Sequence, residues 1–317
     1  MDDNKTNPGL AEVFKPTVDR NKSSEKPETE QKPVNPLQAY FRKPAIYIKL
    51  PSGGKFNTPD EIDMPENGEI PVYPMTAKDE IMMRTPDALM NGATTVEVIQ
   101  SCVPAIKNAW QISALDIDMI LISIRIATYG ETTEVKGVCP KCRTENVYEL
   151  DLRNITDKVS TPDFRPVLEI DDLTLHFRPL TYQVATKESL KNFEQQRMIQ
   201  SISNSELDEQ ERIEKFQDAF LRLTVYSVGI LAETVSKVVM PDGTEVTDQD
   251  QIAEFVANAD RTIFNKIKEH LDATKNSTTI EPIQFECTGE TDLEGNNTPC
   301  DQKWSQPFTI DNSTFFG

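Results

Sequence analysis

The sequence has little of what many enzymes and membrane proteins need. Only two histidines occur among its 317 residues, His176 and His270, so few histidine-based mechanisms are open to it. It has no run of about 18 apolar residues, and a transmembrane helix is therefore not expected. Residues 1–16 contain neither a basic segment nor an apolar one, which argues against a secretory signal. We expect a protein that stays in a cytoplasm.

Basic residues are also scarce. Lys and Arg number 33 against 52 Asp and Glu, which gives a formal net charge of -19. A negative field of this size repels nucleic acids and anionic membranes, because contacts to phosphate dominate such binding. It favours solubility and basic protein partners. Hydrophobic residues make up 37% of the chain and the mean hydropathy is -0.49, so we expect a core diluted by solvated segments.

The amino-terminal segment, residues 1–44, predicts a disordered arm. It holds six prolines among Lys, Glu, Asn, Ser and Thr, a composition that buries too little apolar area to offset chain entropy. One apolar island, Leu10–Phe14, either docks on a partner or is plain linker.

Apolar periodicity in the rest of the chain predicts an α+β fold, a helical core packed on short antiparallel hairpins. Strands are expected at 46–50 and 69–75, and Thr76 with Asp79 resembles a capping box that starts a helix. Thr94 or Thr95 should cap the next helix. The segment 113–130 is apolar on most sides and is predicted to be the central buried helix, from a Ser cap to Gly130.

Four segments follow from these patterns. They are the arm 1–44, a core α+β domain 45–150 that ends in a cysteine knuckle, a hairpin and helical region 151–280, and a second cysteine hairpin with the tail 281–317. Within 151–280 we expect hairpins at 167–178 and 237–246, helices over 181–236, and one last helix over 250–271. Phe315 and Phe316 either dock internally or insert into a partner's groove.

The cysteines carry the strongest chemical signal. In a reducing compartment, five cysteines are more typical of metal ligands or core residues than of disulfides. Cys139 and Cys142 have the C-x2-C spacing that lets two thiolates reach one ion, and Cys287 and Cys300 form a second pair with a longer spacing. We predict a structural zinc on these four, in a split zinc-ribbon-like element, with Cys300 the weakest member. Cys102 is predicted to be a core residue.

Other readings of the cysteines remain open: an iron–sulfur or redox role, and unliganded thiols. Redox C-x2-C motifs generally open a helix after a strand, whereas both flanks here read as strand. A closed shell of four thiolates leaves no open position on a metal, so we do not expect an enzyme. The alternative function is a nucleic-acid-binding zinc ribbon, which the net charge disfavours.

The ordered motifs LPSGGKF, VYPMTAKDEIMMRTPDALMNG, VEVIQSCV, LDIDMILISIRIATYG and CPKC carry a family resemblance, as does the closing PFTIDNSTFFG. In this order they resemble the baseplate hub proteins of T-even-like contractile-tailed bacteriophages. The resemblance is dense over 45–150 and looser over 281–317. The sequence departs from the pattern at Cys287–Cys300, where a compact knuckle is expected.

The resemblance implies a structural component or assembly factor of a tail baseplate hub, without enzymatic activity. Expected partners are other hub proteins and the tape-measure protein, acting before the tail tube grows, with no nucleic acid and no membrane. Self-association into a homo-oligomer is left open. The expected location is the host cell cytoplasm during assembly, and the baseplate of the finished virion tail is left open as well.

Overall fold

The computed structural model describes residues 37, 41–84, 92–160, 162–203, 208–278, 280–293, 296–308, 310, 315 and 316. The chain divides into two compact units, residues 1–41 and 42–317. Most of the predicted arm, including Leu10–Phe14, lies outside the described residues.

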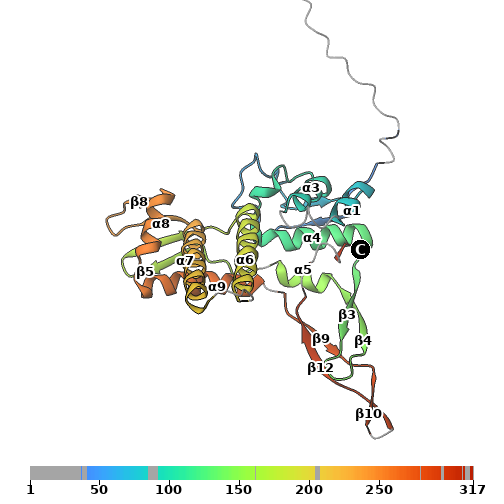
Figure 1. Cartoon of the computed structure of the whole chain (residues 1–317). Coiled ribbons are helices and arrows are strands. Elements are labelled where there is room, and N and C mark those ends of the chain that lie inside the picture. Colours follow the sequence, from blue (N-terminus) through green and yellow to red (C-terminus); the bar gives the residue numbers. More distant parts are fainter. Residues whose placement is uncertain are drawn as a thin grey trace, which may run out of the picture. The chain divides into compact units, whose positions relative to one another are not determined.

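The second unit has a mixed α+β fold, as predicted (Figure 1). Its strands are β1 (Ile46–Ile48), β2 (Ile70–Val72), β3 (Thr132–Val138), β4 (Glu145–Asp151), β5 (Val167–Ile170), β6 (Leu173–Phe177), β7 (Val235–Val239), β8 (Glu245–Val246), β9 (Ile283–Glu286), β10 (Glu290–Leu293), β11 (Asn296–Pro299) and β12 (Lys303–Gln306). Its helices are α1 (Ala77–Met83), α3 (Ala93–Cys102), the short 3-10 turn η2 (Ala109–Gln111), α4 (Ala114–Tyr129), α5 (Arg153–Val159), α6 (Tyr182–Ser203), α7 (Glu209–Thr234), α8 (Gln249–Asn258) and α9 (Arg261–Thr278).

Helix α4 is the centre of the larger hydrophobic core. The Ser113 side chain accepts a hydrogen bond from the Leu115 N–H at its start, and Gly130 ends it with a φ of 94°. Residues 116, 117 and 119–124 are all buried, which confirms that the helix is apolar on most sides. The same core takes in side chains of β1, β2, α3 and α5.

The carboxy-terminal phenylalanines belong to this core. Phe315 is 7% exposed and Phe316 is 1% exposed. The Arg125 Nε donates to the Phe315 carbonyl at 2.9 Å, and the Tyr129 hydroxyl donates to the Phe316 carbonyl at 3.0 Å. The two phenylalanines therefore dock internally, and do not project toward a partner's groove, in this structure.

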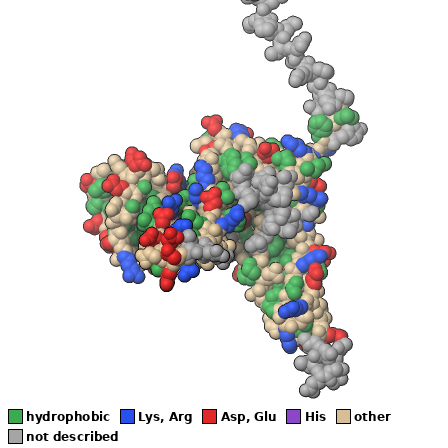
Figure 2. All heavy atoms as spheres, viewed as in Figure 1, with side chains coloured by type: hydrophobic (Ala, Val, Ile, Leu, Met, Phe, Trp, Pro, Cys, Tyr) green, Lys and Arg blue, Asp and Glu red, His purple; other side chains and the backbone are tan. Residues whose placement is uncertain are grey.

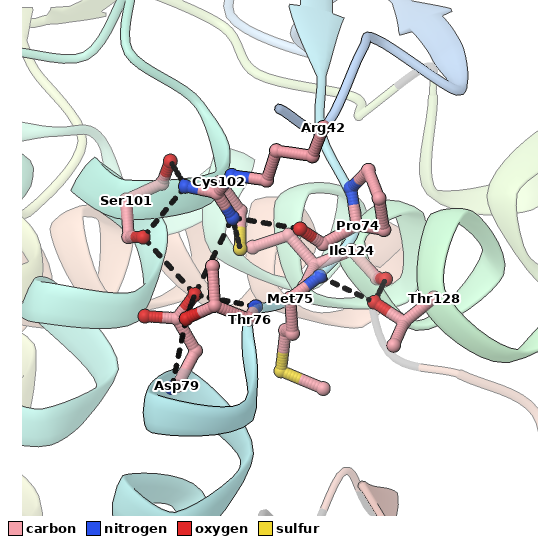
Figure 3. Close-up of polar contacts among 9 residues, drawn as sticks. All are labelled: Arg42, Pro74, Met75, Thr76, Asp79, Ser101, Cys102, Ile124 and Thr128. Atoms are coloured by element: carbon pink, nitrogen blue, oxygen red, sulfur yellow. Dashed lines mark hydrogen bonds and ion pairs between the residues drawn. The ribbon is translucent and has the colours of Figure 1, made fainter. Parts of the chain in front are cut away.

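A partly buried polar network surrounds Arg42, at the start of the second unit (Figure 3). The guanidinium of Arg42 donates to the Pro74 carbonyl at 2.7 Å, to Asp79 Oδ2 at 3.3 Å and to Ser101 Oγ at 2.8 Å. Asp79 also completes the predicted capping box, because its carboxylate accepts from the Thr76 N–H while its own N–H donates to the Thr76 hydroxyl. Arg42, inside the segment predicted as the arm, therefore ties the chain to α1 and α3.

A second buried carboxylate holds the turn after β1. Asp116 is fully buried and accepts from the Ser52 N–H at 2.7 Å and from the Ser52 hydroxyl at 2.6 Å. Burial raises the pKa of Asp116 to about 6, although both hydrogen bonds favour the carboxylate. The Pro51–Gly54 turn is therefore anchored on the first turn of α4.

The smaller core lies on a four-stranded antiparallel sheet in the order β5-β6-β7-β8. Both predicted hairpins are present, and the pairing of Leu175 with Val238 joins them into one sheet. Residues of α8 and α9 cover this sheet, with Ile252, Val256 and Ile267 buried. Helices α6 and α7 confirm the two helices expected between the hairpins.

Two predicted helix boundaries are wrong. Helix α3 begins at Ala93 after Gly92, whose φ is 75°, so Thr94 and Thr95 are buried inside the helix and do not cap it. The single last helix predicted over 250–271 is two helices. They separate because the Asp260 carboxylate accepts from the N–H groups of residues 262 and 263 and so starts α9.

Candidate metal centre

Two antiparallel hairpins carry the four predicted ligands. Strands β3 and β4 pair as far as Val138 and Glu145, and the loop between them holds Cys139 and Cys142. Strands β9 and β12 pair as far as Glu286 and Lys303, and Cys287 and Cys300 lie between those strands. The hairpins lie side by side (Figure 1).

The four sulfur atoms of this cysteine cluster lie within 4.8 Å of one another. The Sγ atoms of Cys139 and Cys300 are 3.8 Å apart, and those of Cys142 and Cys287 are 3.3 Å apart. A tetrahedral zinc site with Zn–S bonds of about 2.3 Å places its sulfurs about 3.8 Å apart. Three of the four cysteines are buried and Cys142 is half-buried, so the thiols face one another and are largely shielded from solvent. The structure therefore brings the four predicted residues together.

The long spacing of the second pair has a simple structural explanation. The first loop, 139–144, has six residues. The second also has six, 287–289 and 300–302, once the hairpin β10–β11 is set aside. Glu290 pairs with Pro299 at the base of that hairpin, and the Cys300 N–H donates to the Gly289 carbonyl at 2.9 Å. The second pair is therefore a compact C-x2-C knuckle with a ten-residue hairpin, residues 290–299, inserted between its third and fourth positions.

Backbone geometry supports this equivalence. The Cys139 N–H donates to the Thr144 carbonyl at 3.0 Å, and the Cys287 N–H donates to the Gln302 carbonyl at 2.9 Å, five residues on once the hairpin is omitted. The residue after each second cysteine has positive φ, 61° at Arg143 and 45° at Asp301. Positive φ is uncommon outside glycine, so its recurrence at matching positions marks two loops of the same kind.

Two kinds of hydrogen bond surround the cysteine cluster, one to a sulfur atom and others between the two loops. The Gly289 N–H points at Cys287 Sγ, at 3.3 Å. The buried Asn146 links the two loops, since its Nδ2 donates to the Thr144 carbonyl at 2.9 Å and its Oδ1 accepts from the Thr288 N–H at 2.9 Å. Asn146 is a supporting residue that the sequence did not reveal, because nothing local places an Asn on β4 beside a loop 142 residues away.

An aromatic layer packs the two hairpins together beneath the sulfurs. Phe285 is 2% exposed and stacks on Trp304, with ring centroids 5.2 Å apart and planes 14° apart. Its other neighbour is Tyr148, edge-on at 5.0 Å. Gly137 leaves room for this ring, because a Cβ there would lie 2.7 Å from Phe285 Cε1. The hairpins therefore contact through side chains as well as through the cysteine cluster.

The thiols differ in acidity. Burial raises the pKa of Cys287 to about 12 and also raises the pKa of Cys300. Hydrogen bonding with the side chain and backbone of Thr144 lowers the pKa of Cys142 to about 6. Because only thiolates bind metal, an incoming ion has to displace protons from the buried thiols. The metal affinity should therefore decrease as the pH is lowered.

The remaining cysteine and the histidines stay outside the cluster. Cys102 is fully buried on α3, as predicted, and burial raises its pKa to about 12. His270 Nε2 lies 2.8 Å from the Arg165 carbonyl and its ring packs on Phe177. Among the described residues, the cysteine cluster is the one group of His, Cys, Asp or Glu side chains with metal-binding spacing.

The donor set suits one zinc ion. Four thiolates in a tetrahedral arrangement are typical of zinc or iron–sulfur sites, and the N–H group aimed at sulfur supports bound thiolate. The loop 139–144 runs from strand to strand with no helix after it, unlike the redox C-x2-C motif.

The family model described as T4 bacteriophage base plate protein matches residues 43–298. The chain belongs to this family. The match covers the middle region 151–280, which contains none of the quoted motifs, and takes in three of the four cysteines. No curated protein and no solved structure matches the chain.

Membership of the baseplate family gives the chain a structural role in the phage tail, in association with other baseplate proteins. Within the part of the chain that the structure describes, no helix is both long and apolar enough to cross a membrane.

Proposed function

We propose that the chain is a non-catalytic component or assembly factor of the baseplate hub, stabilised by one structural zinc on Cys139, Cys142, Cys287 and Cys300. The observation that supports the zinc proposal is the cysteine cluster, in which all four sulfur atoms lie within 4.8 Å of one another. Four thiolates complete a tetrahedral shell, so the ion would have no open position for a substrate or an activated water. Its contribution would be folding free energy.

The zinc would close a very long loop. The two cysteine knuckles lie on hairpins that are separated by more than 140 residues of sequence. Each hairpin alone has only two strands. An isolated two-stranded hairpin is marginally stable in water, and the aromatic layer around Phe285 is small. A metal shared by both hairpins makes their folding mutually dependent and fixes the β10–β11 hairpin that projects from the second knuckle.

The position in the hub rests on the family match together with the resemblance of residues 45–150 and 281–317 to hub proteins. The partners would be other hub proteins and the tape-measure protein. The protein would act in the host cell cytoplasm during assembly and stay in the baseplate of the tail. Cryo-electron microscopy of tails from the phage that encodes the chain should place it on the tail axis. Density only at the baseplate periphery, or none in tails and in assembly intermediates, would contradict the hub assignment.

The inserted hairpin gives a sharp test of the metal site. A chain lacking residues 290–299, with Gly289 joined to Cys300, should still bind one zinc, because the deletion leaves a compact C-x2-C knuckle. In contrast, Gly289→Val keeps the hairpin but puts a Cβ into the space of the Thr144 side chain, and should weaken zinc binding. Competition with a chromogenic chelator measures both. Loss of zinc from the deletion variant and full retention by Gly289→Val would mean that the hairpin itself shapes the site.

A further inference from the structure

One face of the long helix α7 is exposed in the part of the chain that the structure describes. Of its 26 residues only Ala219, Ala232 and Thr234 are buried. Leu221 is 65% exposed and Val225 is 66% exposed, and their spacing puts them on the same face, one turn apart. Exposed Gly229 continues the series one turn further on. Large apolar side chains in register on an exposed helix are typical of an interaction surface.

This face borders a hollow of about 410 Å³ between α7 and α8. Val225, Gly229 and Ile230 of α7 line it together with Ala253 of α8. A Cβ added at Gly229 would meet no atom within 4 Å, so the glycine leaves the floor open. The hollow lies between two helices and is lined partly by apolar side chains. A groove of this kind can bind the apolar side chains of a third helix.

Acidic side chains lie beside the apolar surface. Glu233 and Asp250 line the hollow, and none of the described residues that line it is Lys or Arg. The Glu233 carboxylate lies 3.7 Å from the Arg178 guanidinium. Both side chains are exposed, so the negative charge of Glu233 remains largely accessible to solvent. Toward the start of α7, Glu214 and Asp218 continue on the same face, with Asp218 paired to Arg222 at 2.9 Å. Figure 2 shows acidic and hydrophobic side chains close together in the region of α7.

We propose that this α7–α8 surface, defined by Leu221, Val225, Gly229, Glu233 and Asp250, binds an amphipathic helix of another baseplate protein. The bound helix would place apolar side chains over Leu221 and into the hollow. Lys or Arg residues beside its apolar stripe would face Glu233 and Asp250.

A second copy of this chain fits the surface less well. The same face of a second molecule would bring Glu233 and Asp250 against their own counterparts, in a chain that already carries a net charge of -19. A basic partner meets complementary charge. The proposal goes beyond the metal site and does not depend on zinc.

The probe is a fluorescent 18-residue helical peptide of Leu and Lys, apolar on one face, with a Leu and Glu peptide of the same pattern as its counterpart. Binding to the full chain is followed by anisotropy. Leu221→Ser with Val225→Ser should weaken binding of the Lys peptide by at least about tenfold, since apolar contact is lost while charge is kept. Glu233→Gln with Asp250→Asn should weaken it too and reduce its salt dependence.

The matched control is Tyr47→Ser with Val167→Ser, which removes exposed apolar side chains (63% and 42% exposed) from β1 and β5. It should bind the Lys peptide as the unmodified chain does. Equal binding of the Glu peptide, equal loss in the control, or no loss in Leu221→Ser with Val225→Ser would overturn the proposal. So would a dimer, seen by sedimentation, that this double variant dissociates, because the surface would then bind a second copy.

Discussion

Removing the proposed zinc should open the two cysteine hairpins while the rest of the fold stays intact. A strong chelator, or Cys139→Ser, should speed hydrogen exchange at the amides of Cys287 and Cys300 by at least about a thousandfold, because zinc in small structural sites contributes about 10 kcal/mol or more. Both amides are hydrogen-bonded within the second knuckle, to Gln302 and Gly289. The core around α4 does not include the cysteine cluster, so its amides should keep their protection.

Cys102→Ala is the matched control for this experiment. It removes a buried cysteine from α3, outside the cluster, and should keep slow exchange at Cys287 and Cys300 even though it disturbs the core. Unchanged exchange at those two amides after chelation would show that the aromatic layer alone holds the hairpins. Zinc would then have no structural role.

Phe316→Ala should destabilise the core by about 3–5 kcal/mol, the usual cost of removing a fully buried Phe side chain. The ring is 1% exposed and packs edge-on against Phe315 at 5.1 Å. The backbone beside it is held by Arg125 and Tyr129 of α4, so a cavity there cannot close easily. Urea unfolding monitored by circular dichroism gives the change in the free energy of unfolding.

Phe220→Ala serves as its counterpart, since that ring on α7 is 55% exposed. It should change the free energy of unfolding by less than about 0.5 kcal/mol. A similar small change in Phe316→Ala would mean that the carboxy-terminal residues do not dock on α4 in solution. They would then be available to a partner.

Features that depend on a few neighbouring residues were predictable from the sequence. The capping box of Thr76 and Asp79, the Ser113 cap and the Gly130 stop all depend on contacts within one helical turn. The spacing of Cys139 and Cys142 likewise defines a knuckle without help from the rest of the chain. Where two local signals competed, prediction failed, as at Gly92, which starts α3 ahead of two threonines that are better caps in isolation.

Features that depend on distant partners were not predictable. The long spacing between Cys287 and Cys300 has no local explanation in the sequence, and only the pairing of Glu290 with Pro299 shows that a hairpin accounts for it. Asp116 gave no signal, because its role needs Ser52, 64 residues away. The role of Asn146 is likewise not indicated by any local sequence pattern. Each of these residues owes its position to tertiary packing, which no local pattern encodes.

The central claim is that one zinc joins the two knuckles, and elemental analysis of the purified full chain tests it most directly. Inductively coupled plasma mass spectrometry, combined with protein mass in solution, should find one zinc per chain. The Cys139→Ser and Cys287→Ser variants should lose it, and Cys102→Ala should keep it. A metal-free chain that nevertheless folds with the cysteine hairpins protected, or zinc that survives loss of Cys287, would contradict the account.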